Sequence, residues 1–335
     1  MQQVISIVIP MYNLERHIEA TLNSVIHQDY ADLEIIAVDD ASTDDTLAIA
    51  EKTLKSSNRK YQTIRMKENG GVSVARNAGL SKTTGEFVLF WDGDDLADPD
   101  FISTLHKTML SVDNCDIAFC GYRTREEETG TEKIYPANAQ QIADKTPQQL
   151  DAMRITHKVE ILLCAMLYRR SFLVEHELLF ATGCGAGEDV EFIIKALATC
   201  RRFAISSGCS YIYMLHQLMG SRDKSKTREQ RLSRYEQNTK AHRRTVDYLQ
   251  KVAIEKELLE VLNYNLTQET ILRELTVFAG KMDYNSFIEY VNAPAILKKL
   301  MSYKLTTGKP EIFAKTLLVL FYPRLYFNTR KDKFN

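Results

Sequence analysis

The run Val4-Ile5-Ser6-Ile7-Val8-Ile9-Pro10 is the first of several short apolar segments that decide the fold of this 335-residue chain. Its β-branched residues and closing proline are typical of a buried parallel strand. Similar runs recur through the first hundred residues, separated by stretches with apolar residues at helical spacing. The strand-like runs are residues 4–9, 33–38, 61–66 and 86–91, and the helical stretches are residues 17–27, 44–54 and 71–81. This alternation predicts a mostly parallel sheet covered by helices on both faces.

Polar residues directly follow three of the predicted strands. The segments are Pro10-Met11-Tyr12-Asn13, Asp39-Asp40-Ala41-Ser42 and Asp92-Gly93-Asp94-Asp95. Ligands of such sheets bind beyond the carboxyl ends of the strands. We therefore expect the three segments to converge in one crevice.

The acidic cluster after the fourth predicted strand is a candidate metal site. Asp92 and Asp94 offer hard oxygen ligands of the kind that Mg²⁺ and Mn²⁺ prefer. Gly93 between them permits a sharp turn and a close approach of the backbone. An Asp-x-Asp pair alone is a weak motif because most such clusters are turns, but its place directly after a strand favours a functional interpretation.

Composition limits the classes of protein to consider. The formal net charge is −1 and hydrophobic residues make up 44%, which is typical of a globular protein without a basic surface for nucleic acid. We see no signal-peptide pattern and no apolar stretch of the ~20 residues that span a membrane, so we expect a cytoplasmic protein. The six cysteines form no CxxC pair or zinc-site spacing and should be reduced, mostly buried thiols. They are Cys115, Cys120, Cys164, Cys184, Cys200 and Cys209.

The second half of the chain is organised differently from the first. Residues 122–153 are polar and charged, and we interpret them as a loop-rich insertion. A glycine-dotted segment then precedes a helix that begins at Glu188. The highly charged stretch 221–244 marks the expected boundary between a first domain, residues 1–220, and a helical C-terminal region, residues 221–335.

Five motifs together resemble the family 2 glycosyltransferases, a large inverting group of GT-A fold that builds bacterial surface polysaccharides. The matching segments are residues 4–13, 24–46, 68–80, 85–95 and 187–192. They occur in the order and spacing of the family, and five ordered motifs are far more specific than any one of them. The resemblance implies an α/β, Rossmann-like GT-A sheet, a UDP-sugar donor and Mn²⁺ or Mg²⁺ as cofactor.

The resemblance assigns the nucleotide base to the first two strand ends. Pro10 and Tyr12 would line its pocket, with Tyr12 packed against the base, and Asp40 would accept a hydrogen bond from it. A turn-capping role is the alternative for Asp40. One departure is Ala41, where the family commonly has glycine. Because alanine is comfortable only at negative φ, we expect a slightly different turn there.

Further residues are assigned by the resemblance to the diphosphate and the metal. Asn69 and Arg76 would face the nucleotide and diphosphate, where a guanidinium group suits phosphate oxygens. A surface salt bridge is the alternative for Arg76. Asp92 would contact the ribose or the water shell of the metal, Asp94 would bind the metal directly, and Asp95 would support the turn.

The general base of an inverting transferase takes the proton of the acceptor hydroxyl as its oxygen attacks the anomeric carbon. The family pattern gives this role to Asp189, with Glu188 orienting the acceptor or the base. The alternative is that both acidic residues serve the helix dipole at a helix N-terminus. His216 could reach the metal or the diphosphate, although a lone histidine is more often structural.

The C-terminal tail combines a short apolar segment, residues 312–322, with aromatic residues and the basic Arg330, Lys331 and Lys333. This pattern suits an interfacial membrane segment. A helix docked on the protein's own core, or on a partner subunit, is the alternative. Membrane contact would fit a lipid-linked acceptor at the inner face of the cell membrane.

The sequence thus predicts an inverting, metal-dependent transferase that moves a sugar from a UDP-sugar to a glycan or lipid-linked acceptor. Its pathway would be the synthesis of capsule, lipopolysaccharide, exopolysaccharide or teichoic acid. A nucleotidyltransferase would need a loop rich in glycine and lysine after the first strand. Residues 10–17, which follow that strand here, contain neither. A noncatalytic glycan-binding module would lose Asp94 or Asp189, and both are present. The donor sugar, the acceptor and the oligomeric state stay open.

Overall fold

The computed structural model describes residues 3–216, 227–262, 266–301 and 310–331. These residues form two compact units, which are described one after the other. The first unit contains Met1–Leu150, Val159–Gly183 and Thr199–Arg222, and the second contains Asp151–Lys158, Cys184–Ala198 and Asp223–Asn335. The chain therefore passes from one unit to the other several times.

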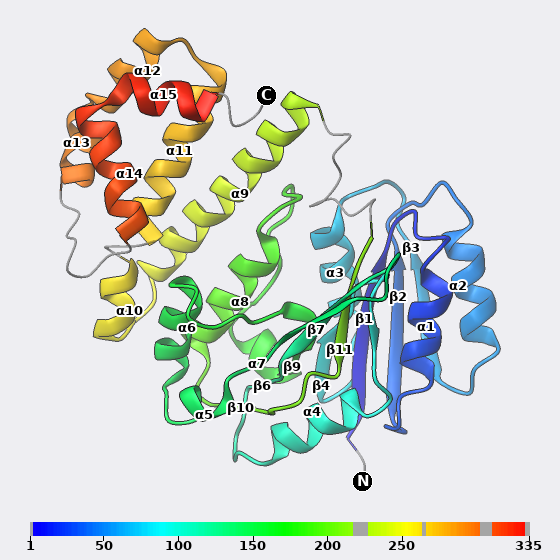
Figure 1. Cartoon of the computed structure of the whole chain (residues 1–335). Helices are drawn as coiled ribbons and strands as arrows, with labels where there is room; N and C mark the ends of the chain where they lie inside the picture. Colours follow the sequence, from blue (N-terminus) through cyan, green and yellow to red (C-terminus); the bar gives the residue numbers. More distant parts are fainter. Residues whose placement is uncertain (1–2, 217–226, 263–265, 302–309, 332–335) are drawn as a thin grey trace. The chain divides into compact units, whose positions relative to one another are not determined.

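A seven-stranded sheet forms the centre of the first unit (Figure 1), with the strand order β10-β6-β9-β4-β1-β2-β3. The strands are β1 (Ile5–Met11), β2 (Leu33–Asp39), β3 (Lys60–Arg65), β4 (Phe87–Phe90), β6 (Ile117–Phe119), β9 (Met166–Arg169) and β10 (Phe203–Ile205). In this sheet β9 pairs antiparallel with β4 and β6, and the other neighbouring strands are parallel. The predicted mostly parallel sheet is confirmed.

Helices flank this sheet (Figure 1). They are α1 (Ile18–Ile26), α2 (Thr46–Lys55), α3 (Val72–Leu80), α4 (Phe101–Leu110), α7 (Arg170–Glu175) and the 3-10 turn Leu163–Ala165. Helix α3 lies so close to β1 that a Cβ atom on Gly79 would be 2.4 Å from Cγ1 of Val8. The strands and helices predicted for the first hundred residues are all present, with ends shifted by one or two residues.

The sheet owes its order to apolar residues that are enclosed on both faces. All seven residues of β1 and all seven of β2 are buried, as expected for central parallel strands. Trp91, which directly follows β4, is fully buried between Phe101 and Tyr211, with ring centroids 5.6 Å from each. Its indole N–H donates to the backbone oxygen of Asp95 at 3.1 Å. The core therefore fixes the acidic turn that begins at Asp92.

A second, four-stranded sheet corrects the prediction that residues 122–153 form a loop-rich insertion. Its strand order is β5-β11-β7-β8, namely β5 (Leu96–Ala97), β11 (Tyr211–Leu215), β7 (Tyr122–Glu126) and β8 (Glu132–Tyr135). Two helices, α5 (Ala139–Ile142) and α6 (Pro147–Ile155), complete this region. The β7–β8 pair is for the most part only partly buried, and it carries a cross-strand ion pair in which Arg125 bonds Glu132 at 2.6 Å. Such a hairpin lacks the apolar alternation by which strands are predicted.

The second unit is helical in its described residues. Its helices are α8 (Glu188–Thr199), α9 (Arg228–Leu249), α10 (Lys256–Val261), α11 (Thr267–Lys281), α12 (Tyr284–Val291), α13 (Pro294–Met301), α14 (Pro310–Phe321) and α15 (Pro323–Lys331). One apolar cluster joins Ile155, Ile194 and Ala198 to Val246 and residues of α10. Another joins α11 and α12 to α14 and α15. The helical appendage expected at the C-terminus is present.

The C-terminal tail divides into two faces. Ile312, Val319 and Tyr326 are buried in the core of the second unit, so part of the segment is docked on the protein itself. Phe321 and Leu325 are exposed, by 69% and 54%. Across the described ranges, no helix combines the length and apolar character needed to cross a bilayer. The six cysteines are free thiols, and five of them are buried, as expected.

Candidate active site

The carboxyl ends of β1, β2 and β4 lie beside one another, and the polar segments that follow them meet. The backbone N–H of Asp40 donates to the carbonyl oxygen of Met11 at 2.8 Å. A Cβ atom on Gly93 would lie 2.8 Å from the carbonyl oxygen of Pro10, so the acidic turn runs directly over the end of β1. The three segments converge at one edge of the sheet, as the sequence predicted.

Asp40 ties the end of β2 to the loop before α3. Its side chain is buried, and its two carboxylate oxygens accept hydrogen bonds from the backbone N–H groups of Gly70 and Gly71 at 2.9 and 2.7 Å. The side-chain amide of Asn69 donates to the Asp40 carbonyl oxygen at 3.3 Å. Asp40 therefore shapes this loop, and each carboxylate oxygen keeps a lone pair for a further donor.

The turn after Asp40 holds a left-handed residue. Ala41 has φ of 60°, the conformation that glycine adopts without strain and that costs other residues roughly 1–2 kcal/mol. Ala41 therefore adopts the conformation that a glycine would adopt, and the expectation of a different turn at this position is wrong. Asn13 is also left-handed, with φ of 52°, and its side-chain oxygen accepts from the backbone N–H of Thr43 at 2.9 Å. Tyr12, the residue before Asn13, is 45% exposed.

Arg76 and Asp92 form a close ion pair under the acidic turn. The Arg76 side chain is 5% exposed, and its Nη2 donates to Oδ1 of Asp92 at 2.6 Å. The guanidinium carbon lies 5.2 Å from the centre of the Phe180 ring. Burial against an aromatic face and a bond to one carboxylate hold this cation in a fixed place.

Asp95 is structural. It is fully buried, and its carboxylate accepts from the Tyr211 hydroxyl and from the backbone N–H of Met214, each at 2.8 Å. Burial raises the pKa of Asp95 well above its ordinary value, and the nearby Asp94 and Asp92 raise it further. Asp95 thus joins the acidic turn to strand β11.

Asp94 lies on the open side of the same turn. Its side chain is 23% exposed, and its Oδ2 accepts a hydrogen bond from Nε2 of His216 at 2.8 Å. This bond raises the pKa of His216 above its ordinary value, against the opposing effect of burial. His216 follows β11 directly, and the structure therefore brings together two residues that the sequence separates widely.

The Asp94–His216 pair fits a divalent cation. Carboxylate and imidazole are both ligands that Mn²⁺ accepts in proteins. Two ligand atoms side by side on one such ion lie about 3 Å apart, given metal–ligand distances near 2.1 Å, and the observed separation is 2.8 Å. Nδ1 of His216 is buried and has no partner among the described residues. An ion bound at Asp94 would give the ligand atoms of Asp94 and His216 a partner on the open side of the turn.

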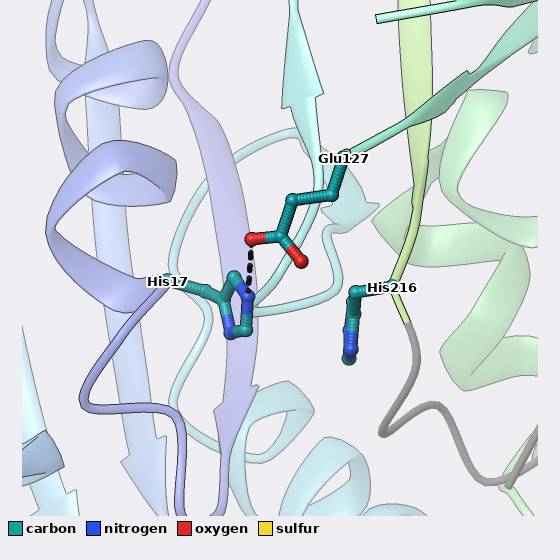
Figure 2. A group of neighbouring side chains, drawn as sticks. All are labelled: His17, Glu127 and His216. Carbon is teal, nitrogen blue, oxygen red and sulfur yellow. Dashed lines mark hydrogen bonds and ion pairs between the residues drawn. The ribbon is translucent and has the colours of Figure 1, made fainter. Parts of the chain in front are cut away.

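Two further residues adjoin His216 and were missed by the sequence analysis (Figure 2). The ring of His17 stacks on that of His216, with centroids 4.6 Å apart and planes at 24°. Nε2 of His17 bonds Oε1 of Glu127 at 3.1 Å. Candidate ligand atoms of the three side chains lie within 4.8 Å of one another. A histidine before a helix and a glutamate in a charge run carry no motif that would reveal this cluster.

Asp189 and Glu188, the residues that the resemblance assigns to the acceptor side, belong to the second unit. They form the first turn of α8, and both are partly buried. Oδ1 of Asp189 accepts from the backbone N–H of Val190 at 2.8 Å. Glu191, which the sequence analysis did not single out, is 2% exposed and pairs with Arg244 at 2.7 Å. The buried Glu191 and its bond to Arg244 give the start of α8 a fixed place in its unit.

Sequence comparison identifies proteins that are similar to this chain. The family described as "Glycosyl transferase family 2" matches residues 6–175. EpsH of Bacillus subtilis (strain 168), named as a glycosyltransferase, is 32% identical over 70% of this chain and 67% of its own length. TarS of Staphylococcus aureus (strain Mu50 / ATCC 700699), a poly(ribitol-phosphate) beta-N-acetylglucosaminyltransferase, is 29% identical over 62% of this chain and 35% of its own length. Two relatives besides EpsH are matched over 60% and 63% of their own lengths.

Solved structures share the fold. A crystal structure of a TarS fragment in complex with UDP-GlcNAc has a TM-score of 0.68 at 20% identity, covering 99% of this chain and 90% of that one. The mannosyltransferase PcManGT from Pyrobaculum calidifontis, in complex with GDP-Man and Mn²⁺, has a TM-score of 0.59 at 17% identity, covering 100% and 85%. The likeness confirms the predicted GT-A fold.

Proposed function

This chain belongs to glycosyl transferase family 2, and we propose that it moves a sugar from a UDP-sugar to a hydroxyl group of a glycan or lipid-linked acceptor. The observation that carries the proposal is a pair of contacts at the end of β4. Arg76 bonds Asp92 and His216 bonds Asp94, so a buried cation and two candidate metal ligands meet at one turn. A donor diphosphate needs both kinds of group.

The nucleotide would bind across the ends of β1 and β2. The exposed ring of Tyr12 supports stacking on a base, and such a stack is favourable for any aromatic heterocycle. Pro10 is buried near the end of β1, and it would line the base pocket from below. Asp40 would accept from the base with the lone pairs that the loop amides leave, and Asn69 would contact the nucleotide.

The cation and Arg76 would act on the diphosphate. Asp94 and His216 would hold Mn²⁺ or Mg²⁺, and the bound ion would offset the negative charge that develops on the leaving diphosphate. Arg76 adds a positive charge whose direction is fixed by Asp92 and Phe180. Asp92 itself would contact the ribose or the water shell of the ion. These residues bind the donor and orient it.

The acceptor step would invert the anomeric carbon, with Asp189 as general base. The acceptor oxygen forms a bond to that carbon as the bond to the diphosphate oxygen breaks, and the bonding electron pair leaves with the UDP. The hydroxyl proton passes to the carboxylate of Asp189. Glu188 would orient the acceptor. Family membership supports this assignment, together with the place of both residues in the first turn of α8.

The proposed pathway is the synthesis of a surface polysaccharide such as capsule, lipopolysaccharide, exopolysaccharide or teichoic acid. Support comes from the relatives, since TarS is named for sugar transfer to poly(ribitol phosphate). The solved TarS complexes with UDP-GlcNAc and with UDP make a UDP-sugar the first donor to test. UDP-GlcNAc, UDP-GalNAc, UDP-Gal and UDP-Glc are the candidates.

Peripheral membrane contact is proposed for the C-terminal helices. Leu317, Phe321 and Leu325 follow one another at intervals of four residues along α14 and into α15, and all three are exposed. Tyr322 and Arg324 beside them are exposed as well. Aromatic and apolar side chains next to a cation suit the surface of an anionic bilayer. A lipid-linked acceptor would be found there.

The proposal is tested with a donor screen on the purified chain. Hydrolysis of the four UDP-sugars is measured with Mn²⁺, with Mg²⁺ and with a chelator. We expect release of UDP from at least one donor, dependent on the ion. If no UDP-sugar is bound or hydrolysed with metal present, the proposed function is wrong.

Two variants separate the donor side from the acceptor side. Asp94→Asn should abolish metal-dependent donor binding, because it removes the charged ligand. Asp189→Asn should leave UDP-sugar binding within about threefold and lower transfer by roughly 10²–10⁴, the usual contribution of a general base. Calorimetry reports binding and a coupled UDP assay reports transfer. Normal transfer by Asp189→Asn would place the base elsewhere.

A further inference from the structure

His17 and Glu127 lie beside His216 and have no role in the function proposed above (Figure 2). We infer that both are positioning residues, which hold the His216 imidazole in the orientation that presents it to a cation at Asp94. The inference rests on the proposed function, because it concerns the same cation. His17 acts through a ring stack at 4.6 Å, and Glu127 acts through a hydrogen bond to His17 at 3.1 Å.

The ring geometry favours support over direct ligation. A histidine binds a metal through a nitrogen lone pair that lies in the plane of its ring. The rings of His17 and His216 are nearly parallel, at 24°, so their lone pairs do not converge on one point between them. Face-to-face contact instead restricts rotation of the His216 ring about its Cβ–Cγ bond.

Within the described residues, hydrogen bonds hold the His216 ring at one nitrogen only. One nitrogen bonds Asp94, which is the bond that a cation between the two residues would replace. The other nitrogen, Nδ1, has no partner in the described part of the chain. A metal-binding histidine is usually oriented by a hydrogen bond from its second nitrogen, and loss of such support typically weakens metal binding 10–100-fold. The stack with His17 takes the place of that bond here.

The supporting side chains are themselves held in place by the backbone. His17 stands at the start of α1, where its carbonyl oxygen accepts from Thr21 at 3.1 Å. The N–H of Glu127 donates to the carbonyl oxygen of Leu215 at 3.0 Å, so Glu127 extends the β7–β11 pairing beside His216. The bond between His17 and Glu127 then joins α1 to the second sheet.

The test measures Mn²⁺ binding by electron paramagnetic resonance in the full chain, with and without UDP. His17→Ala should weaken Mn²⁺ binding about 10-fold or more, because it removes the stack. His17→Phe keeps an aromatic face and should restore affinity to within about threefold of wild type. Glu127→Ala should weaken binding to an intermediate extent. His27→Ala is the matched control, since His27 caps the other end of the same helix, is exposed, and its side chain bonds the backbone oxygen of Asn23 in that helix.

Three results would overturn the inference. Wild-type affinity in His17→Ala would show that the stack does not position His216. Failure of His17→Phe to restore affinity, in a protein that melts like wild type, would show that His17 acts by its nitrogen atoms. Binding of two Mn²⁺ ions per chain, reduced to one in His17→Ala, would make His17 a ligand of a second ion. These three results would leave the proposed function intact. If wild type binds no Mn²⁺ even with UDP, the metal-dependent function proposed above is wrong, so failure of the inference and failure of the function are distinguishable.

Discussion

The carboxyl group of Asp151 is fully buried, and among the described residues neither of its oxygens has a hydrogen-bond partner. Burial raises its pKa well above the ordinary value, although the charge of Arg154 lowers it in part. The unfolded chain releases this proton near pH 4, whereas the folded chain keeps it to higher pH. The stability that depends on protonated Asp151 is therefore complete below about pH 4 and is lost as the pH rises toward the folded-state pKa.

We expect Asp151→Asn to raise the midpoint of thermal unfolding at pH 7. Asparagine has the shape of the protonated acid and never ionises, so the variant should gain about 1 kcal/mol, or about 2–4 °C. At pH 4 the gain should shrink, because wild-type Asp151 is then protonated in both states. Scanning calorimetry at the two pH values measures both effects. Asp144→Asn, at an exposed carboxylate, is the control, and an equal gain at both pH values would contradict the expectation.

Individual site residues differ in how far the sequence could reveal them. Asp94 and Arg76 lie in motifs, so their residue types and order suggested a role before any geometry was known. The sequence could not show that Arg76 is held by Asp92, or that His17 stacks on His216. Those contacts join residues from separate elements, and only the folded sheet brings them together.

At the scale of elements, the apolar strands β1 and β2 were predictable from the sequence, and the charged strands β7 and β8 were not. β1 and β2 are continuous apolar runs and were found within two residues of their observed ends. β7 and β8 carry charge on an open hairpin, where Arg125 and Glu132 pair across the strands. Their pattern resembles that of a loop, because ion pairs rather than burial hold them.

The exposed apolar residues of α14 and α15 lead to a prediction about binding to membrane vesicles. Replacing Phe321 and Leu325 together by serine should lower binding to phosphatidylglycerol vesicles about 30-fold, since two exposed apolar anchors are lost at roughly 1 kcal/mol each. The core of the unit should be unaffected, because Ile312, Val319 and Tyr326 remain. Vesicle sedimentation measures the effect.

A matched control for that experiment lies in the first unit. Val174 and Leu179 are exposed by 60% and 56%, and their replacement by serine should leave vesicle binding unchanged. Comparison with phosphatidylcholine vesicles, which carry no net charge, gives the part of vesicle binding that is due to the anionic lipid. Equal partition of the Phe321/Leu325 variant and wild type would exclude these helices as the membrane surface.

At the scale of the whole molecule, the two units are interleaved along the chain. The second unit takes the segments Asp151–Lys158 and Cys184–Ala198 from within the sequence of the first. In its apolar core Ile155, Ile194 and Ala198 pack with Val246. The start of α8, which carries the proposed general base Asp189, thus depends for its folding on helices that follow much later in the sequence.

A chain that ends after Arg222 should consequently fold poorly, even though it keeps every motif of the active site. It would expose the apolar face that α9 and α10 cover in the second unit, and such patches cause aggregation. We expect a low soluble yield and strong binding of a hydrophobic dye. Ile194→Ser in the shortened chain should improve the yield. A soluble, cooperatively melting fragment with wild-type Ile194 would contradict this expectation.

The same interleaving sets an order of events on the ribosome. Helix α8 is synthesised well before Val246, Leu249 and Leu258, the residues that cover Ile194 in the finished unit. Nascent chains begin to fold from their N-terminal parts, so for this interval the apolar face of α8 has no partner. A pause or a premature stop codon in that interval would therefore leave a substrate for chaperones and proteases, and not a shorter enzyme.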